Sequence, residues 1–261
     1  MAKQWAWVAV LVGGLVLFEV VRRVLVTTGN PNLVPSLILL GAVIAPATFV
    51  TLVAGRRLAF GVSSLLVVGV AFVGGVVGVA TAGMLEYDTV RDLGALPMVG
   101  VGLIEEAAKL LVPLAVLIGL RERRPADGLL LGVACGAGFA ALETMGYAFV
   151  VLIRSHGDVA VVDDILLIRG VSSPAAHMAW TGLTAAALWY AANRRFSGVA
   201  VARFFGVFVL AVILHAAWDG VGAVALYVVL AVVSLALLTV VAYRLPADPL
   251  HARQHTSRAI R

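Results

Sequence analysis

The sequence has 261 residues, of which 62% are hydrophobic and only 13% charged, and its mean hydropathy is +1.06. Soluble globular domains carry about twice this share of charged residues, so the composition excludes an ordinary soluble enzyme and predicts an integral membrane protein. The formal net charge of +5 does not indicate nucleic-acid binding, because the basic residues stand in short groups between apolar runs. The single cysteine, Cys135, leaves neither a disulfide framework nor a cysteine metal site.

Eight apolar runs account for nearly the whole chain, and each has the roughly 20 residues that a helix needs to cross the hydrocarbon core. Segments with charged residues, Gly or Pro divide them, among them 86–92, 121–127 and 154–169, and only Asp219 and Gly220 separate the last two. We therefore predict an all-α fold, a polytopic membrane helical bundle of about eight transmembrane helices that forms a single membrane domain over residues 1–261. The predicted helices are 5–26, 33–54, 62–85, 96–120, 128–153, 171–192, 199–218 and 221–243.

The basic residues between these helices predict the orientation of the chain. One side of the membrane receives Lys3, Arg56, Arg57, Arg121, Arg123, Arg124, Arg194, Arg195, Arg203, Arg244, Arg253, Arg258 and Arg261. The other side receives Arg22, Arg23, Arg91, Arg154 and Arg169. Because cytoplasmic loops carry the excess of Lys and Arg, both termini are predicted to lie in the cytoplasm, as parts of a multi-pass protein of the cell membrane.

The helix 96–120 carries three ionisable residues, Glu105, Glu106 and Lys109. Such residues cost at least ~2.5 to 3.5 kcal/mol each in the bilayer centre, so they normally face a protein interior and have partners. Glu105 and Lys109 are four residues apart and share one helix face. A buried ion pair that locks this helix is the structural explanation, but the second carboxylate is not needed for that purpose.

The next three helices each carry ionisable groups, namely Glu143, His177 and the pair His215 and Asp219. At about 1.5 Å of rise per residue, Glu105, Glu143, His177 and His215 lie about 6 to 16 Å below the outer ends of their helices. Small residues flank each group and allow helices to approach closely. The agreement in depth predicts one shared site in the outer half of the bilayer.

The charges of this site leave two chemistries open. Glu105, Glu106 and Glu143 outnumber the single Lys109, so either some carboxyls are protonated or a divalent cation such as zinc lies among them with the two histidines. A glutamate can act as general base toward water, or carboxylate and imidazole ligands can hold a metal that activates the water. Both chemistries predict a hydrolase.

The ordered set Glu-Glu-x-x-Lys, Phe-x-x-x-Glu, His and His-x-x-x-Asp, from Glu105 to Asp219, resembles the PrsW family of intramembrane proteases. It is also similar, more distantly, to the CAAX prenyl protease and bacteriocin-immunity superfamily, which has His where this chain has Glu143 and Asn where it has Asp219. The resemblance implies a peptidase acting on membrane-anchored protein substrates in the bilayer, in some relatives as a step of signalling proteolysis. It implies a catalytic core at about 96–220, with the catalytic residues Glu105, Glu106, Glu143, His177 and His215, supported by Lys109, Asp219 and Phe139.

Several of these residues also have structural interpretations. The two histidines can donate to backbone carbonyls, Glu143 can bond near Thr144 or Tyr147 or to a facing helix, and Asp219 can cap the last helix or orient His215. Trp180 and Trp218 are predicted to be interfacial anchors. The acidic segment 154–169, with His156, Asp158, Asp163 and Asp164, has residue types that can bind a metal, but it is predicted to be a solvated loop or a segment that admits substrate. At the level of function, the alternatives are a proton- or cation-coupled transporter and an inert membrane scaffold or sensor.

Overall fold

A computed structural model describes residues 2–56, 58–94, 96–121, 123–220 and 222–246. Within these ranges the chain forms α-helices joined by short connections, with no β-strand, so the predicted all-α membrane bundle is confirmed. The α-helices are α1 (Ala2–Thr28), α2 (Val34–Ala54), α3 (Ser64–Leu93), α4 (Met98–Gly119), α5 (Pro125–Arg154), α6 (Val159–Ser172), α7 (His177–Asn193), α8 (Gly198–Gly220) and α9 (Val224–Arg244).

In the described part of the chain, 5 helical segments are long and apolar enough to cross a membrane, namely Pro31–Ala54 and the helices α3, α5, α8 and α9. The number of spans and the cytoplasmic position of both termini stay predictions. Four basic residues used for that orientation, Arg57, Arg253, Arg258 and Arg261, lie outside the described residues.

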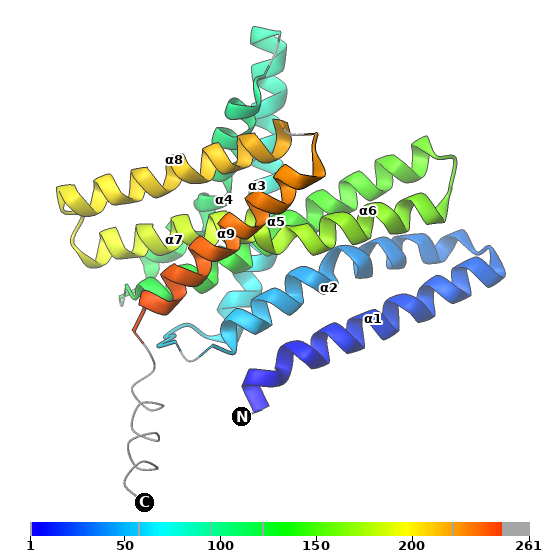
Figure 1. The fold of residues 1–261 in the computed structure, drawn as a ribbon, viewed down its shortest axis with the longest axis horizontal. Coiled ribbons are helices and arrows are strands. Elements are labelled where there is room, and N and C mark those ends of the chain that lie inside the picture. The colour runs from blue at the N-terminus through cyan, green and yellow to red at the C-terminus, as the bar shows by residue number, and fades with distance from the viewer. Residues whose placement is uncertain (1, 57, 95, 122, 221, 247–261) are drawn as a thin grey trace, which may run out of the picture.

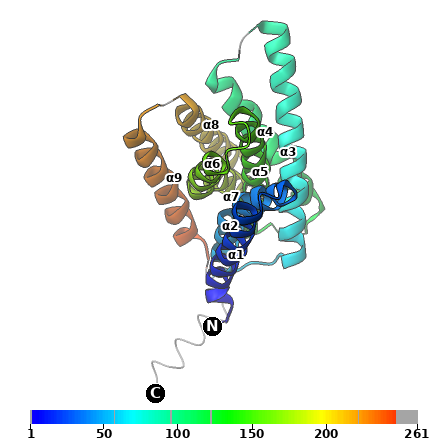
Figure 2. The same cartoon turned by 90° about the vertical axis from the view of Figure 1, so that its right-hand side faces the viewer.

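Helix α5 lies at the centre of the bundle and contacts α2, α3, α6 and α7 (Figure 1). Helices α1 and α2 run side by side, and α9 lies on the flank opposite α3 (Figure 2). Glycines bring α5 close to α7. A Cβ atom on Gly136 would lie 2.5 Å from the carbonyl oxygen of His177, and one on Gly132 would collide with the carbonyl oxygen of Thr181. Only glycine allows this close approach of the two backbones.

The predicted helix 171–192 is wrong at its start, and so is the predicted loop 154–169. Residues Val159–Ser172 form helix α6, a 3₁₀ turn follows at Ser173–Ala175, and α7 begins at His177. Pro174 in this turn has no backbone N–H and disfavours helical backbone before it, and the helix is broken at Ala176, whose φ of −107° and ψ of −114° are not helical. The interruption places His177 at the first position of α7 rather than inside a helix.

The segment 86–92 is also helical, contrary to the predicted connection. Helix α3 continues to Leu93 and ends at Gly94, which has φ 71° in the left-handed region that favours glycine. Arg91 in the last turn pairs with Asp88 at 3.3 Å and with Asp92 at 3.1 Å, which lets this polar turn stay helical. Glu86 therefore belongs to a helix of the bundle.

Candidate active site

Helix α4 buries its three charges together inside the bundle. The side chains of Glu106 and Lys109 have no exposed surface, and that of Glu105 is 10% exposed. The Lys109 ammonium donates a hydrogen bond to Glu106 Oε1 at 2.9 Å and pairs with Glu105 Oε2 at 3.1 Å. One lysine therefore offsets part of the charge of both glutamates, and it packs 4.2 Å from the ring centroid of Phe139.

His177 connects α4 to α5. Its Nδ1 lies 2.7 Å from Lys109 Nζ, and its Nε2 lies 3.0 Å from Glu143 Oε2. An ammonium group only donates hydrogen bonds, so Nδ1 of a neutral imidazole accepts from Lys109 and Nε2–H donates to the Glu143 carboxylate. The Glu143 carboxylate thus fixes which nitrogen of His177 carries the proton.

His215 on α8 also donates a ring N–H to a carboxylate. Its Nδ1 lies 2.9 Å from Glu106 Oε1, and because a carboxylate accepts, Nδ1–H is the donor. Its Nε2 lies 3.5 Å from Glu105 Oε2 and 3.2 Å from Asp219 Oδ2. Nε2 and these two carboxylates cannot share this space favourably unless a cation, either a second proton or a metal ion, lies among them.

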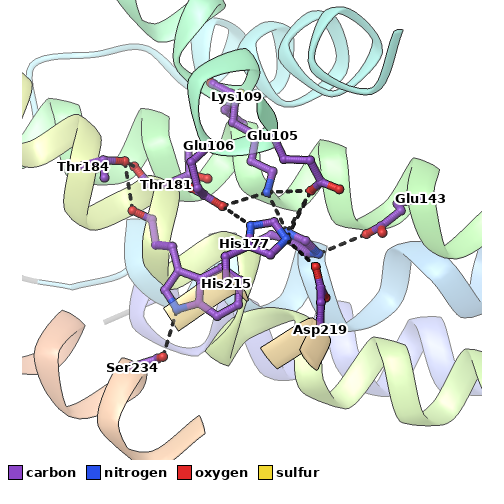
Figure 3. Close-up of polar contacts among 12 residues, drawn as sticks. Glu105, Glu106, Lys109, Glu143, His177, Thr181, Thr184, His215, Asp219 and Ser234 are labelled. Carbon is purple, nitrogen blue, oxygen red and sulfur yellow. Dashed lines mark hydrogen bonds and ion pairs between the residues drawn. The ribbon is translucent and has the colours of Figure 1, made fainter. Parts of the chain in front are cut away.

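These contacts aim three donor atoms at one region (Figure 3). Glu105, His177 and His215 each offer one ligand atom, and these atoms lie within 4.8 Å of one another. Glu105 Oε2 lies 3.5 Å from His215 Nε2 and 4.0 Å from His177 Nδ1. A tetrahedral zinc site with bonds of about 2.1 Å separates its ligand atoms by roughly 3.4 Å, so this donor set and spacing fit a zinc-like ion.

The carboxylate partners of the two histidines strengthen this fit. A histidine that binds a metal usually donates its other ring N–H to a carboxylate or carbonyl, which fixes the tautomer and the ring orientation. Glu106 has this position at His215, and Glu143 has it at His177. The arrangement therefore contains a Glu-His-His ligand set together with two carboxylates that orient the imidazoles.

Arg169 on α6 belongs to this cluster, although sequence reasoning placed it in a loop. Its Nη2 lies 2.7 Å from Glu143 Oε2, its Nε donates to Thr144 Oγ1 at 3.4 Å, and its guanidinium carbon lies 4.0 Å from the centroid of the Tyr147 ring. Glu143 therefore pairs with another helix, not with Thr144 or Tyr147 of its own. The spacing of residues in the sequence does not identify Arg169 as a site residue, because its position beside Glu143 depends on how α6 folds back before the turn at Ser173–Ala175.

Aromatic side chains enclose the histidines. The ring of Trp180 lies 5.0 Å from that of His215 and 5.8 Å from that of His177, and its Nε1 donates to Ser234 Oγ on α9 at 2.9 Å. Trp180 is fully buried, so its predicted role as an interfacial anchor is wrong. It packs against Trp218, which also contacts the ring of Tyr227.

A cavity of about 640 Å³ opens onto the cluster. Glu105, Glu143, His177 and Asp219 line it, whereas Glu106 and Lys109 lie behind the lining. Residues that the predicted site did not include also line it, in particular Glu86, Tyr147, Arg169, Ser172, Ser173 and Tyr227. The cavity therefore gives a substrate access to one face of the cluster.

Asp219, Asp158 and Asp163 each have a partner in the described part of the chain. Asp219 lies inside α8 and contacts His215, while the N-cap position of α9 is Ala223. In the segment 154–169, Asp158 caps α6 through Ala160 N, and Asp163 pairs with Arg22 of α1 at 2.7 Å. Among the described residues, the group with metal-ligand spacing is Glu105, His177 and His215, so a metal site in that segment is not supported.

Comparison with known proteins agrees with this geometry. The sequence model of the PrsW family, described as intramembrane metalloproteases, matches residues 2–243. The chain belongs to the PrsW family. None of the curated proteins and none of the solved structures compared with the chain matches it. Membership in the PrsW family makes the chain a membrane protease, and the family description is consistent with a metal at the Glu-His-His group.

Proposed function

We propose that this member of the PrsW family is an endopeptidase that hydrolyses peptide bonds of membrane-anchored proteins at a metal ion held by Glu105, His177 and His215. The observation that supports it most directly is the orientation of the two imidazoles. Glu106 and Glu143 each accept an N–H from one ring, so the other nitrogens turn toward Glu105. Histidines with a purely structural role do not need to present lone pairs to one common point.

Each residue of the cluster has a distinct part in this proposal. A bound zinc-like ion would supply a polarised water and an electrophile for the scissile carbonyl. Glu106 and Glu143 hold the ligand imidazoles in place, and Lys109 offsets the charge of Glu105 and Glu106 within the bundle. Asp219 lines the cavity, and its carboxylate would accept the one proton that the attacking water loses.

The bundle supports the reaction by limiting access of water. The cluster lies among α4, α5, α7 and α8, and its histidine side chains are at most 10% exposed. Electrostatic stabilisation is stronger in such a site than in water, because few mobile dipoles screen it. We include in the proposal a catalytic core at about 96–220, and the release of a membrane-anchored regulator as the biological outcome.

A glutamate-only mechanism is the second candidate, because one observation favours it. The Lys109 ammonium contacts Glu105 Oε2 and His177 Nδ1, so it serves as the cation of two of the three donors. In that version Glu105 takes the proton of the water, and the imidazoles stabilise the developing oxyanion. A transporter is less well supported, since the buried charges form one cluster rather than a path.

The test is cleavage of a labelled single-span membrane protein by the purified chain in detergent, before and after treatment with a zinc chelator. We expect wild-type cleavage to disappear with the chelator and to return with added zinc, and Glu105→Gln to be inactive. The matched control is Glu19→Gln, which removes a carboxylate of α1 that pairs with Arg22 and Arg23. Full activity of the metal-free protein would contradict the metal mechanism and favour the glutamate-only mechanism. Full activity of Glu105→Gln would contradict both mechanisms.

A further inference from the structure

Glu86 is a carboxylate of the cavity that the proposed chemistry does not use. It lies on α3, on the cavity wall that also includes Glu105 and Glu143. Its Oε1 is buried and has no hydrogen-bond partner among the described residues, and no basic side chain in that part of the chain forms an ion pair with Glu86. Glu86 as a whole is only partly buried, but its oxygen Oε1 is shielded from water without a donor, so a positive charge that reaches this wall would give it a partner.

The other carboxylates of the cavity already have cationic partners or proton donors. Glu143 pairs with Arg169, Glu105 pairs with Lys109, and Asp219 contacts His215. Glu86 therefore differs from them within the described ranges. A cationic group that enters the cavity can therefore pair with Glu86 without displacing a partner of Glu105, Glu143 or Asp219.

The net charge of the lining points the same way. With the buried groups behind the lining included, Glu86, Glu105, Glu106, Glu143 and Asp219 are five carboxylates, whereas Arg169, Lys109 and a divalent ion supply four positive charges, so one carboxylate stays unmatched. A substrate that carries a positive charge into the cavity offsets this excess. A substrate that carries a carboxylate is repelled.

Arg169 shows how a guanidinium is held in this cavity. Its Nη2 lies 2.7 Å from Glu143 Oε2, and its guanidinium carbon lies 4.0 Å from the centroid of the Tyr147 ring. The cavity lining has further aromatic rings in Trp218 and Tyr227. A carboxylate together with aromatic surface is the environment that stabilises an Arg or Lys side chain away from bulk water.

We infer that Glu86 determines substrate specificity by pairing with a Lys or Arg side chain of the substrate close to the scissile bond. The inference rests on the proposed peptidase function and names its substrate class, namely membrane-anchored segments with a basic residue near the cleavage position. Glu86 acts on the choice of substrate, whereas the Glu-His-His group acts on the bond.

The test uses matched single-span substrates that differ only by Lys, Gln or Glu at positions flanking the cleavage position. We expect the wild type to cleave the Lys substrate about tenfold more efficiently than the Gln substrate, as judged by kcat/KM, since close charge pairs at protein interfaces reach couplings of this size. Glu86→Gln abolishes this ratio, and Glu86→Lys reverses it in favour of the Glu substrate. Asp92→Asn, which removes an exposed carboxylate of α3, leaves the ratio unchanged.

A binding measurement separates this inference from the proposed function. Fluorescent versions of the Lys and Gln peptides are titrated against the metal-depleted protein, where no cleavage is needed. Weaker binding of the Lys peptide to Glu86→Gln than to the wild type supports the inference even if every substrate stays uncleaved. Equal Lys-to-Gln ratios for wild type and Glu86→Gln, in binding or in cleavage, overturn it.

Discussion

The Lys109 ammonium lies 2.7 Å from Nδ1 of His177, the imidazole nitrogen that the proposed metal would use. Lys109 and a metal ion are therefore alternative cations for the same donors, since Lys109 also lies 3.1 Å from Glu105 Oε2. The cluster has an excess of carboxylates, so it needs positive charge whether or not a metal is bound. This relationship makes the two candidate mechanisms separable by experiment.

Replacement of Lys109 by Met tests this competition. In metal-free protein we expect Lys109→Met to lower stability by about 3–5 kcal/mol, because it leaves two buried carboxylates without their cation. Added zinc should restore most of the loss, since the divalent ion supplies the missing charge. Thermal unfolding in detergent, with and without zinc, measures both effects. Arg91→Gln, which breaks exposed pairs at the end of α3, is the control and should shift Tm little.

A Lys109→Met protein that is destabilised to the same extent with and without zinc would contradict this expectation. It would show that the ammonium, and not a metal, is the cation of the donor group. The glutamate-only mechanism would then be favoured.

The carboxylates of α4 are expected to differ in their effect on metal binding. Glu105 is a proposed ligand, whereas Glu106 accepts the Nδ1–H of His215 and a hydrogen bond from Lys109. Glu106→Gln should lower zinc affinity by about 10–100-fold, the usual effect of removing a carboxylate that orients a ligand histidine. Glu105→Gln should lower it further, and competition with a chelating dye measures both. Equal affinities for the two variants would mean that the roles of these neighbours are not distinct.

The sequence predicts the membrane class and the members of the cluster, because hydropathy and buried charge are local properties of the residues. Glu105, Glu106, Glu143, His177 and His215 stand out since an ionisable side chain inside an apolar run needs a partner. Their convergence is predicted from similar depth, although the segment 154–169, from whose ends the depths of Glu143 and His177 are counted, is mostly helical. The family match covers residues 2–243 and shows the family, while the roles of these residues stay predictions.

The other features depend on tertiary structure that periodicity does not encode. The apolar residues on both sides of Pro174 continue without interruption, so hydropathy runs one helix from 171 to 192 through the break that separates α6 from α7. Glu86 and Arg169 lie in charged segments that look like loops, and their position at the cavity appears only once α3 and α6 are packed. Tryptophan is common at the membrane interface, so the sequence predicts that role for Trp180. The close contact of α7 with α5 and the hydrogen bond from Trp180 to Ser234 place it in the core instead.

Arg169 is expected to support activity through Glu143. Arg169→Gln removes the guanidinium at 2.7 Å from Glu143 Oε2 and should lower kcat/KM about 10–100-fold, because Glu143 then no longer holds His177 in one orientation. Arg169→Lys keeps the charge but loses the planar contact with Tyr147, so it should recover part of the activity. Cleavage assays on both variants give the comparison. Arg154→Gln, an exposed position at the end of α5, is the control, and an equal loss there would point to a general charge effect.

The close approach of α5 and α7 is expected to set the position of His177. A Cβ on Gly136 would lie 2.5 Å from the His177 carbonyl oxygen, so Gly136→Ala must push the start of α7 away from α5. Overpacking of this kind costs about 1–3 kcal/mol, and the shift separates His177 from Glu143. We expect a lower Tm together with a large loss of cleavage. Gly146→Ala on the same helix has nothing within 4 Å of its Cβ and should stay active and stable. If Gly136→Ala lowers Tm but cleaves normally, the glycine serves packing alone and the imidazole position is fixed by its polar partners.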